Sequence, residues 1–70
     1  MLEKNSLYQI QPLSLNIMDN LTNKEIELIQ DEIVKVLEVK GIRVLIKRLR
    51  TNEIFEVSKQ GLDFAVEKFN

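Results

Sequence analysis

The chain has 70 residues, with 10 Lys and Arg against 11 Asp and Glu, and a formal net charge of −1 at pH 7. It contains no Cys and no His, which excludes disulfides, zinc sites of the Cys/His type, thiol nucleophiles and the Ser-His catalytic arrangement. A domain this small buries a limited share of its unfolded surface, so we expect a homodimer to add core.

The sequence predicts a soluble, cytoplasmic protein. Residues 1–15 contain no continuous apolar run long enough for the core of a signal peptide. No segment approaches the length of a membrane span. We expect a single domain over residues 1–70, in which the polar residues 1–6 are disordered.

The first predicted strand covers residues 13–17. Leu13, Leu15 and Ile17 alternate with polar residues there, which is the pattern of a strand with one buried side. Pro12 has no amide hydrogen to donate, so it belongs at the start of this strand or at a sheet edge.

A long amphipathic helix is predicted next, over residues 22–40. Thr22 and Glu25 have the spacing of a capping box, in which each side chain bonds the backbone amide of the other residue. Apolar residues then recur at three- and four-residue steps and would form one buried stripe. The members of this stripe are Ile26, Ile29, Ile33, Val36 and Leu37. Gly41 follows, and glycine favours the left-handed conformation that ends many helices.

Two more strands, residues 42–49 and 53–58, are predicted to form a hairpin. A two-residue loop at positions 51 and 52 would place oppositely charged residues across from each other. These pairs are Lys47 with Glu56 and Arg50 with Glu53. The side chains that face the helix in this register are Ile42, Val44, Ile46, Phe55 and Val57. The opposite side carries the predicted dimer interface, which consists of Leu45, Leu49 and Ile54.

A last helix is predicted from its N-cap, Ser58, to about residue 69. The apolar residues that would share one side of it are Leu62, Ala65, Val66 and Phe69. The predicted fold class is therefore α+β. It is a small single domain with the order β-α-β-β-α, in which one long helix covers a short sheet.

The sequence contains no catalytic or metal-binding motif. Catalytic carboxylates usually need a pocket that perturbs their pKa values, and no such pocket is indicated by the pattern. The two glycines are too few for a glycine-rich phosphate loop. We therefore expect a protein that is not an enzyme and that uses no cofactor.

Charge is strongly polarised along the chain. Residues 19–39 hold six acids and two bases, whereas residues 40–50 hold five bases and no acid. The acids predicted to bind a partner from one helix face are Glu25, Glu27, Asp31, Glu32 and Glu38. The bases that form the alternative site, for nucleic acid, are Lys40, Arg43, Lys47, Arg48 and Arg50.

Three interpretations of this polarity are open. In the first, the acidic face binds a basic protein at the surface that this partner uses for nucleic acid. In the second, the basic strand binds phosphates itself, although no aromatic platform for stacking bases accompanies it. In the third, the charges serve only solubility, and the function lies in the apolar dimer interface.

The overall character of the chain resembles that of a known class of proteins. It is short, free of Cys and His, and rich in Ile, Lys, Asn and Glu, and its predicted helix is acidic and capped. In these respects it is similar to the small inhibitors of the DNA-mimic type that phages make early in infection. The resemblance implies a basic host partner, such as a histone-like nucleoid protein, bound by the five acids of the helix face. Such mimics are generally more acidic overall, so the bases of residues 43–50 would have to be turned away or neutralised.

Overall fold

The structure, a computed structural model, describes residues 1–69 and overturns the predicted α+β fold class. In this range it has seven strands and one short helix, so the domain is nearly all β. The elements in chain order are β1 (Leu7–Ile10), β2 (Leu15–Asp19), β3 (Lys24–Leu28), β4 (Ile33–Lys40), β5 (Arg43–Arg48), β6 (Ile54–Ser58), α1 (Lys59–Asp63) and β7 (Val66–Phe69). No helix within these residues is long and apolar enough to span a membrane.

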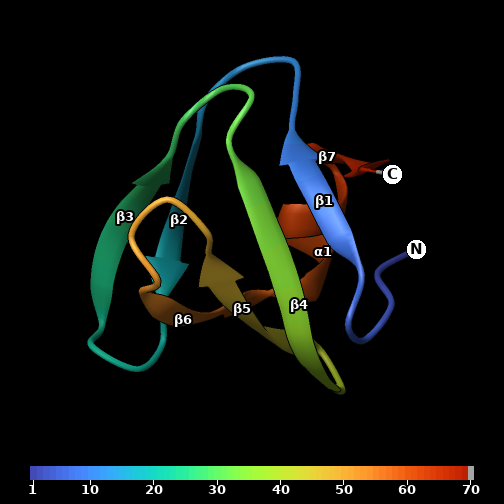
Figure 1. Cartoon of the computed structure of the whole chain (residues 1–70). Helices are drawn as coiled ribbons and strands as arrows, with labels where there is room; N and C mark the ends of the chain where they lie inside the picture. Colours follow the sequence, from blue (N-terminus) through green and yellow to red (C-terminus); the bar gives the residue numbers. More distant parts are fainter. Residues whose placement is uncertain (70) are drawn as a thin grey trace.

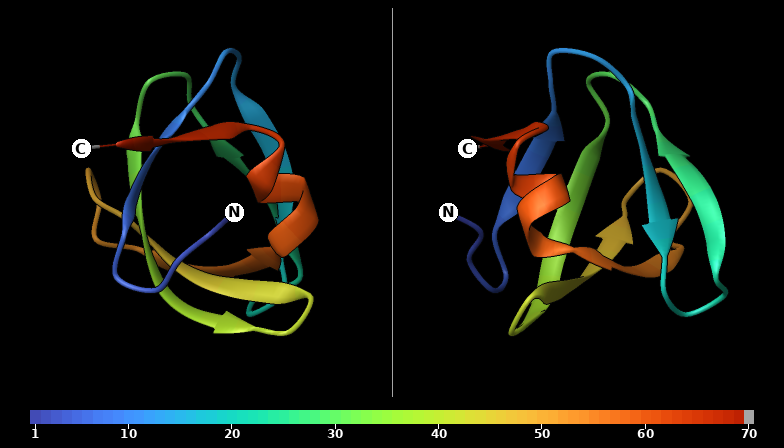
Figure 2. Two further views of the ribbon diagram at one scale, coloured as in Figure 1. Left: turned by 90° about the vertical axis from the view of Figure 1, so that its right-hand side faces the viewer. Right: turned by 180° about the vertical axis from the view of Figure 1, so that it is seen from behind.

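The strands form a five-stranded antiparallel sheet and a separate two-stranded hairpin. The sheet has the order β6-β5-β4-β1-β7, and β2 pairs with β3 in the hairpin. Figure 1 shows the hairpin beside the sheet, and the turned views of Figure 2 show the curved strands around a common interior. The hairpin also meets β6, where the Asn20 amide donates to the Glu56 carbonyl oxygen at 2.8 Å.

The core lies between the sheet, the hairpin and α1. Strand residues reach it at alternate positions because successive side chains on a strand point to opposite sides. The fully buried apolar side chains are Ile10, Leu28, Val34, Val36, Val44, Ile46, Val57 and Leu62. Of residues 1–6, Leu2 is buried in this core, and the Tyr8 hydroxyl accepts from the Glu3 amide at 2.7 Å.

The predicted helix over residues 22–40 is wrong, and with it the prediction that a long helix covers the sheet. These residues form the end of a turn, β3, a second turn and β4. Thr22 caps no helix, because its hydroxyl donates to the Asp19 carboxylate at 2.7 Å in the turn between β2 and β3. The stretch is rich in Ile and Val, whose branched side chains favour strands over helices.

Burial in this stretch follows the two-residue period of strands. Leu28 and Val34 are fully buried, whereas Ile29 is exposed and Ile33 is only half-buried. Ile29 and Ile33 therefore do not belong to a buried helical stripe, and their helical spacing is coincidental. Asp31 separates the two strands with a φ of 72°, which a residue in a right-handed helix cannot adopt.

Positive φ angles mark most of the turns of this fold. The residues concerned are Asn5 (67°), Asn23 (61°), Asp31 (72°), Gly41 (67°) and Asn52 (62°). Gly, Asn and Asp tolerate this conformation best, so the chain reverses its direction at these residues with little conformational strain. The left-handed conformation predicted for Gly41 is confirmed, but Gly41 begins a two-residue turn between β4 and β5 instead of ending a helix.

The hairpin of β5 and β6 is confirmed, but its predicted register is wrong by two residues. Lys47 lies opposite Ile54 instead of Glu56, and Arg50 and Glu53 lie in the connection between the strands. That connection is longer than the two-residue loop predicted for it. Because a shift of two residues keeps each side chain on its side, Val44, Ile46, Phe55 and Val57 are buried as predicted. Ile42, which was predicted to share their side, instead lies exposed in the turn before β5.

The first predicted strand, residues 13–17, is present but shifted, because β2 begins and ends two residues later. Ile17 is buried as expected, whereas Leu13 is exposed in the connection between β1 and β2. Pro12 lies in the same connection, ahead of the strand, as suits a residue without an amide hydrogen.

The predicted C-terminal helix is present only as its first turns. Ser58 is its N-cap, as predicted, and the hydroxyl oxygen accepts from the Gly61 amide at 3.2 Å. The helix ends at Asp63, and the chain then continues as β7. This last strand satisfies the backbone groups along one edge of β1, for example where Val66 pairs with Ile10.

Candidate functional site

The hairpin of β2 and β3 is fixed to β6 by the carboxylate of Asp19. This side chain is only 1% exposed and accepts hydrogen bonds from the backbone amides of Leu21, Thr22 and Glu56. The Thr22 hydroxyl donates a further one. Burial by itself raises the pKa of Asp19, but the hydrogen bonds, led by that from the Glu56 amide, together outweigh it and hold the pKa below its usual value.

Replacing Asp19 by Asn is expected to cost about 1 to 3 kcal/mol of unfolding free energy at neutral pH, because buried amide donors lose their charged acceptor. The substitution should also reduce the loss of unfolding free energy that acid causes. Since folding lowers the pKa of Asp19, its contribution is present above the unfolded-state pKa of about 4 and is lost as the pH falls through the folded-state pKa.

Urea unfolding at neutral pH and at about pH 3, a value below the usual pKa of Asp, measures this contribution. The wild type should lose more stability between the two conditions than Asp19→Asn does. Asp63→Asn serves as the control, because Asp63 is exposed at the end of α1. If wild type and Asp19→Asn lost the same stability in acid, the assigned role of the carboxylate would be wrong.

A second buried carboxylate, Glu32, lies at the opposite end of the hairpin. One of its oxygens is 3.0 Å from Arg48 Nε and 3.3 Å from Arg50 Nε. The other oxygen accepts from the Ile29 amide at 2.5 Å. Glu32 was predicted to belong to the exposed acidic face, but in the structure it is buried and forms ion pairs with two bases of the same chain.

Arg48 was predicted to belong to the basic alternative site, and it too is buried. Besides Glu32 it contacts the exposed Glu53 carboxylate at 3.6 Å and donates to the Glu27 carbonyl oxygen. The centre of its guanidinium group lies 5.5 Å from the centre of the Phe55 ring, within the range of a cation-π contact. Its position therefore suits a structural side chain better than a phosphate ligand.

The remaining bases of the run lie on the outer side of the sheet. Lys40 Nζ is 2.9 Å from Glu56, and an Arg43 nitrogen is 3.7 Å from the same carboxylate. Lys47 has no carboxylate within 4.0 Å in the described part of the chain, and it lies beside Lys35 of β4. Four of the five bases in this run thus have a carboxylate partner of their own chain, and the run does not form one open basic surface.

The other predicted acids are exposed but do not share one face. Glu25 and Glu27, which we call the hairpin carboxylates, lie on the same side of β3. Asp31 follows in the turn before β4, and Glu38 lies on the outer side of the sheet, opposite Leu45. Within residues 1–69 none of these four carboxylates forms an ion pair. Two of these four carboxylates thus lie together on the hairpin, and the other two lie elsewhere.

The apolar residues predicted as a dimer interface lie on the outer side of β5 and β6 and in the connection between them. Leu45 and Ile54 point to the same side of the two strands. Ile54 is 48% exposed and Leu49 is 40% exposed, so both are available to a partner. The side is mixed, because Glu38 and Glu56 flank Leu45. A homodimer through this side stays a prediction of the sequence.

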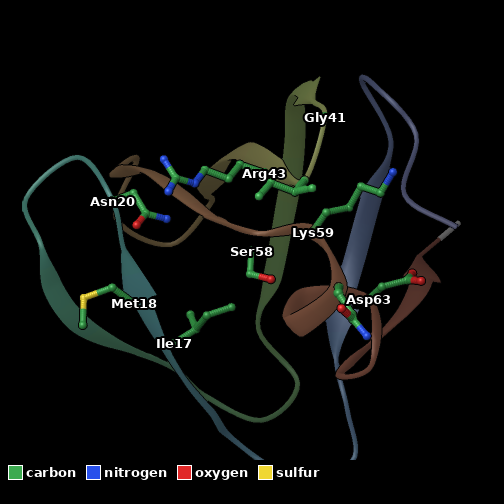
Figure 3. Close-up of a pocket in the computed structure, with 10 residues that line it drawn as sticks. Ile17, Met18, Asn20, Gly41, Arg43, Ser58, Lys59 and Asp63 are labelled. Carbon is green, nitrogen blue, oxygen red and sulfur yellow. The ribbon is translucent and has the colours of Figure 1, made fainter.

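A pocket of about 780 Å³ opens where β2, the β4–β5 turn and α1 meet. Figure 3 shows Met18 and Asn20 on one side of it, Lys59 and Asp63 on the other, and Ser58 between them. The lining residues are Ile17, Met18, Asn20, Gly41, Ile42, Arg43, Ser58, Lys59, Gln60 and Asp63. The sequence does not reveal this pocket, because its walls come from three separate segments that only the fold brings together.

These surfaces offer charge, hydrogen bonds and apolar contact. Within residues 1–69 no group of three or more acidic side chains could hold a metal ion. In comparisons with known proteins, the chain matches no family model, no curated protein and no solved structure.

Proposed function

We propose that this protein is a non-enzymatic, cytoplasmic regulator that binds a basic protein through the hairpin carboxylates. The partner we infer is a nucleic-acid-binding protein, such as a histone-like nucleoid protein, whose nucleic-acid surface the carboxylates would occupy. One observation carries this proposal. Most of the bases that would oppose such a partner are paired with carboxylates of the same chain, whereas Glu25 and Glu27 are exposed and have no ion pair within the described residues.

The distribution of ion pairs supports this assignment. Glu32 binds Arg48 and Arg50, and Glu56 binds Lys40 and Arg43, so two carboxylates account for four bases. Although the net charge is only −1, charge is therefore distributed unevenly over the surface. A basic partner that approaches β3 meets carboxylates that are not already engaged, and such complementarity speeds association.

The geometry of the hairpin also favours this role. Side chains two residues apart on a strand lie roughly 7 Å from each other, so the hairpin carboxylates are spaced for two separate basic side chains. Asp19 and Glu32 fix the segments at the two ends of β3. The carboxylates are thus held on a rigid support, which lowers the entropy lost on binding.

Replacing both hairpin carboxylates by Lys is expected to abolish the displacement of a purified nucleoid protein from labelled duplex DNA, because it reverses the charge at the proposed contact. Wild-type protein should displace the nucleoid protein in a way that weakens as salt is raised. The readout is the fluorescence polarisation of the DNA. Glu67→Lys is the control for a charge reversal elsewhere, because Glu67 is exposed on β7, at the opposite edge of the sheet from β6, which the hairpin meets.

The same titration decides between this proposal and the alternative. Lys35 and Lys47 lie directly opposite each other, and like charges in that position repel, so a bound phosphate would relieve the repulsion. Direct binding of the protein to DNA, lost in Lys47→Glu, would favour nucleic-acid binding by the basic strand. Absence of displacement by wild-type protein, or equal displacement by the hairpin variant, would contradict the proposed function.

A further inference from the structure

The pocket between β2, the β4–β5 turn and α1 lies outside the surface assigned to the basic partner, although Met18 borders both. We infer that it is a separate docking site for a short extended peptide segment of a partner protein. The segment carries an apolar side chain next to an acidic residue. The inference rests on the apolar residues, the charge and the hydrogen-bonding groups of the pocket.

Two apolar residues of the pocket, Ile42 and Met18, are exposed. Ile42 is 81% exposed in a two-residue turn, a position where polar residues and Gly are the rule. Met18 is 49% exposed, and Ile17 beside it is buried at the edge of the core. Apolar side chains of this kind around a concave site are typical of a ligand-binding pocket. They suit one apolar side chain of a ligand.

The charge around the pocket is positive. Of its charged residues, Asp63 lies 3.5 Å from the N-terminal ammonium group and is thereby partly neutralised. Arg43 shares the Glu56 carboxylate with Lys40. Lys59 has no carboxylate within 4.0 Å in the part of the chain that the structure describes. The excess positive charge selects a ligand with a carboxylate.

The polar groups of the pocket can bind a peptide backbone, which presents donors and acceptors in alternation. The Ser58 hydroxyl oxygen accepts from the Gly61 amide, so its hydrogen is left to donate. The Asn20 side-chain amide donates to the Glu56 carbonyl oxygen at 3.3 Å, so its own oxygen is left to accept. Because these groups and Gln60 come from different walls of the pocket, we assign an extended segment as the ligand in preference to a compact molecule.

The two proposed sites differ in the sign of the charge that they select. The hairpin carboxylates select a basic surface, and the pocket selects an acidic segment. Variants of one site should therefore leave the other intact. Failure of one proposal does not imply failure of the other.

The probe for this inference is a displayed library of random 12-residue peptides, selected on the wild-type protein and counter-selected on Ile42→Asp. Peptides that are enriched should contain an apolar residue beside Asp or Glu. Fluorescence polarisation with the synthetic peptides should show binding that is about tenfold weaker or more for Ile42→Asp and for Lys59→Glu, because each removes a main contact.

Matched variants separate pocket binding from other effects. Glu27→Lys should bind the selected peptides as well as wild type does. Ile42 is an exposed turn residue, and an acid at position 59 suits the first turn of α1, so both pocket variants should keep the wild-type circular dichroism spectrum. Enrichment of basic peptides, equal binding by Ile42→Asp and wild type, or no enrichment over three rounds of selection would each overturn the inference.

Discussion

Replacing Glu32 by Ala is expected to lower the free energy of unfolding by about 3 to 5 kcal/mol, because it leaves the buried Arg48 guanidinium without its carboxylate. It also removes the acceptor of the Ile29 amide. A single core of this size supplies only about 3 to 5 kcal/mol, so we expect Glu32→Ala to be largely unfolded at room temperature. Circular dichroism measures the folded fraction of the variant, and urea titration measures its unfolding free energy.

Two further variants test the cause of this loss. Adding Arg48→Met to Glu32→Ala removes the unpaired charge and fills the space with an apolar side chain, so the double variant should recover a large part of the stability. Glu53→Ala removes an exposed partner of the same Arg48 and should cost only about 0 to 1 kcal/mol. A small effect of Glu32→Ala, equal to that of Glu53→Ala, would contradict the buried ion pair.

Replacing Ile46 by Ala is expected to cost about 2 to 5 kcal/mol, because this side chain is fully buried in the core. The same substitution at Ile42, which is exposed in the preceding turn, should change the unfolding free energy by less than about 0.5 kcal/mol. Ile33 is half-buried and should give an intermediate value. Urea unfolding of the three variants measures the series.

This series also separates the observed fold from the predicted helix. In the predicted helix Ile33 would occupy the centre of the buried stripe and would cost as much as Ile46. Equal losses at these two positions would therefore contradict the strand assignment of β4. A large loss at Ile42 would contradict the observed turn.

The sequence predicts some parts of this fold correctly, because the residue pattern there is compatible with only one local structure. Val44 and Ile46 lie two residues apart on β5 and therefore on the same side of it, so their common burial could be inferred even though the predicted register was shifted. The N-cap role of Ser58 depends on local hydrogen bonding alone and was also predicted. Local chemistry was sufficient in both cases.

The stretch from residue 22 to 40 failed because two periods fit it at once. Its apolar residues recur at helical spacing, yet it also contains pairs two residues apart, such as Ile26 with Leu28 and Val34 with Val36. The signal that decides between them is the regular recurrence of turn residues, from Asn23 through Asp31 and Gly41 to Asn52. Turn residues spaced in this way are typical of an all-β chain with short strands.

The candidate sites show a different limit of sequence inference. The charged residues were visible as two runs of opposite sign, but their pairing depends on tertiary contacts such as that between Glu32 and Arg48. As a result, Glu32 from the acidic run and Arg48 from the basic run are buried. The exposed Glu25 and the buried Glu32 look alike in a sequence, so only the fold separates them.

The position of β1 in the sheet has a consequence for the order of events during synthesis. This strand lies between β4 and β7, so one of its edges is paired by the last strand of the described chain. The sheet therefore cannot be completed until residue 69 has left the ribosome. Pairing of segments so far apart in the chain slows folding, and we expect the free domain to fold in milliseconds to seconds, as all-β domains with distant pairings do.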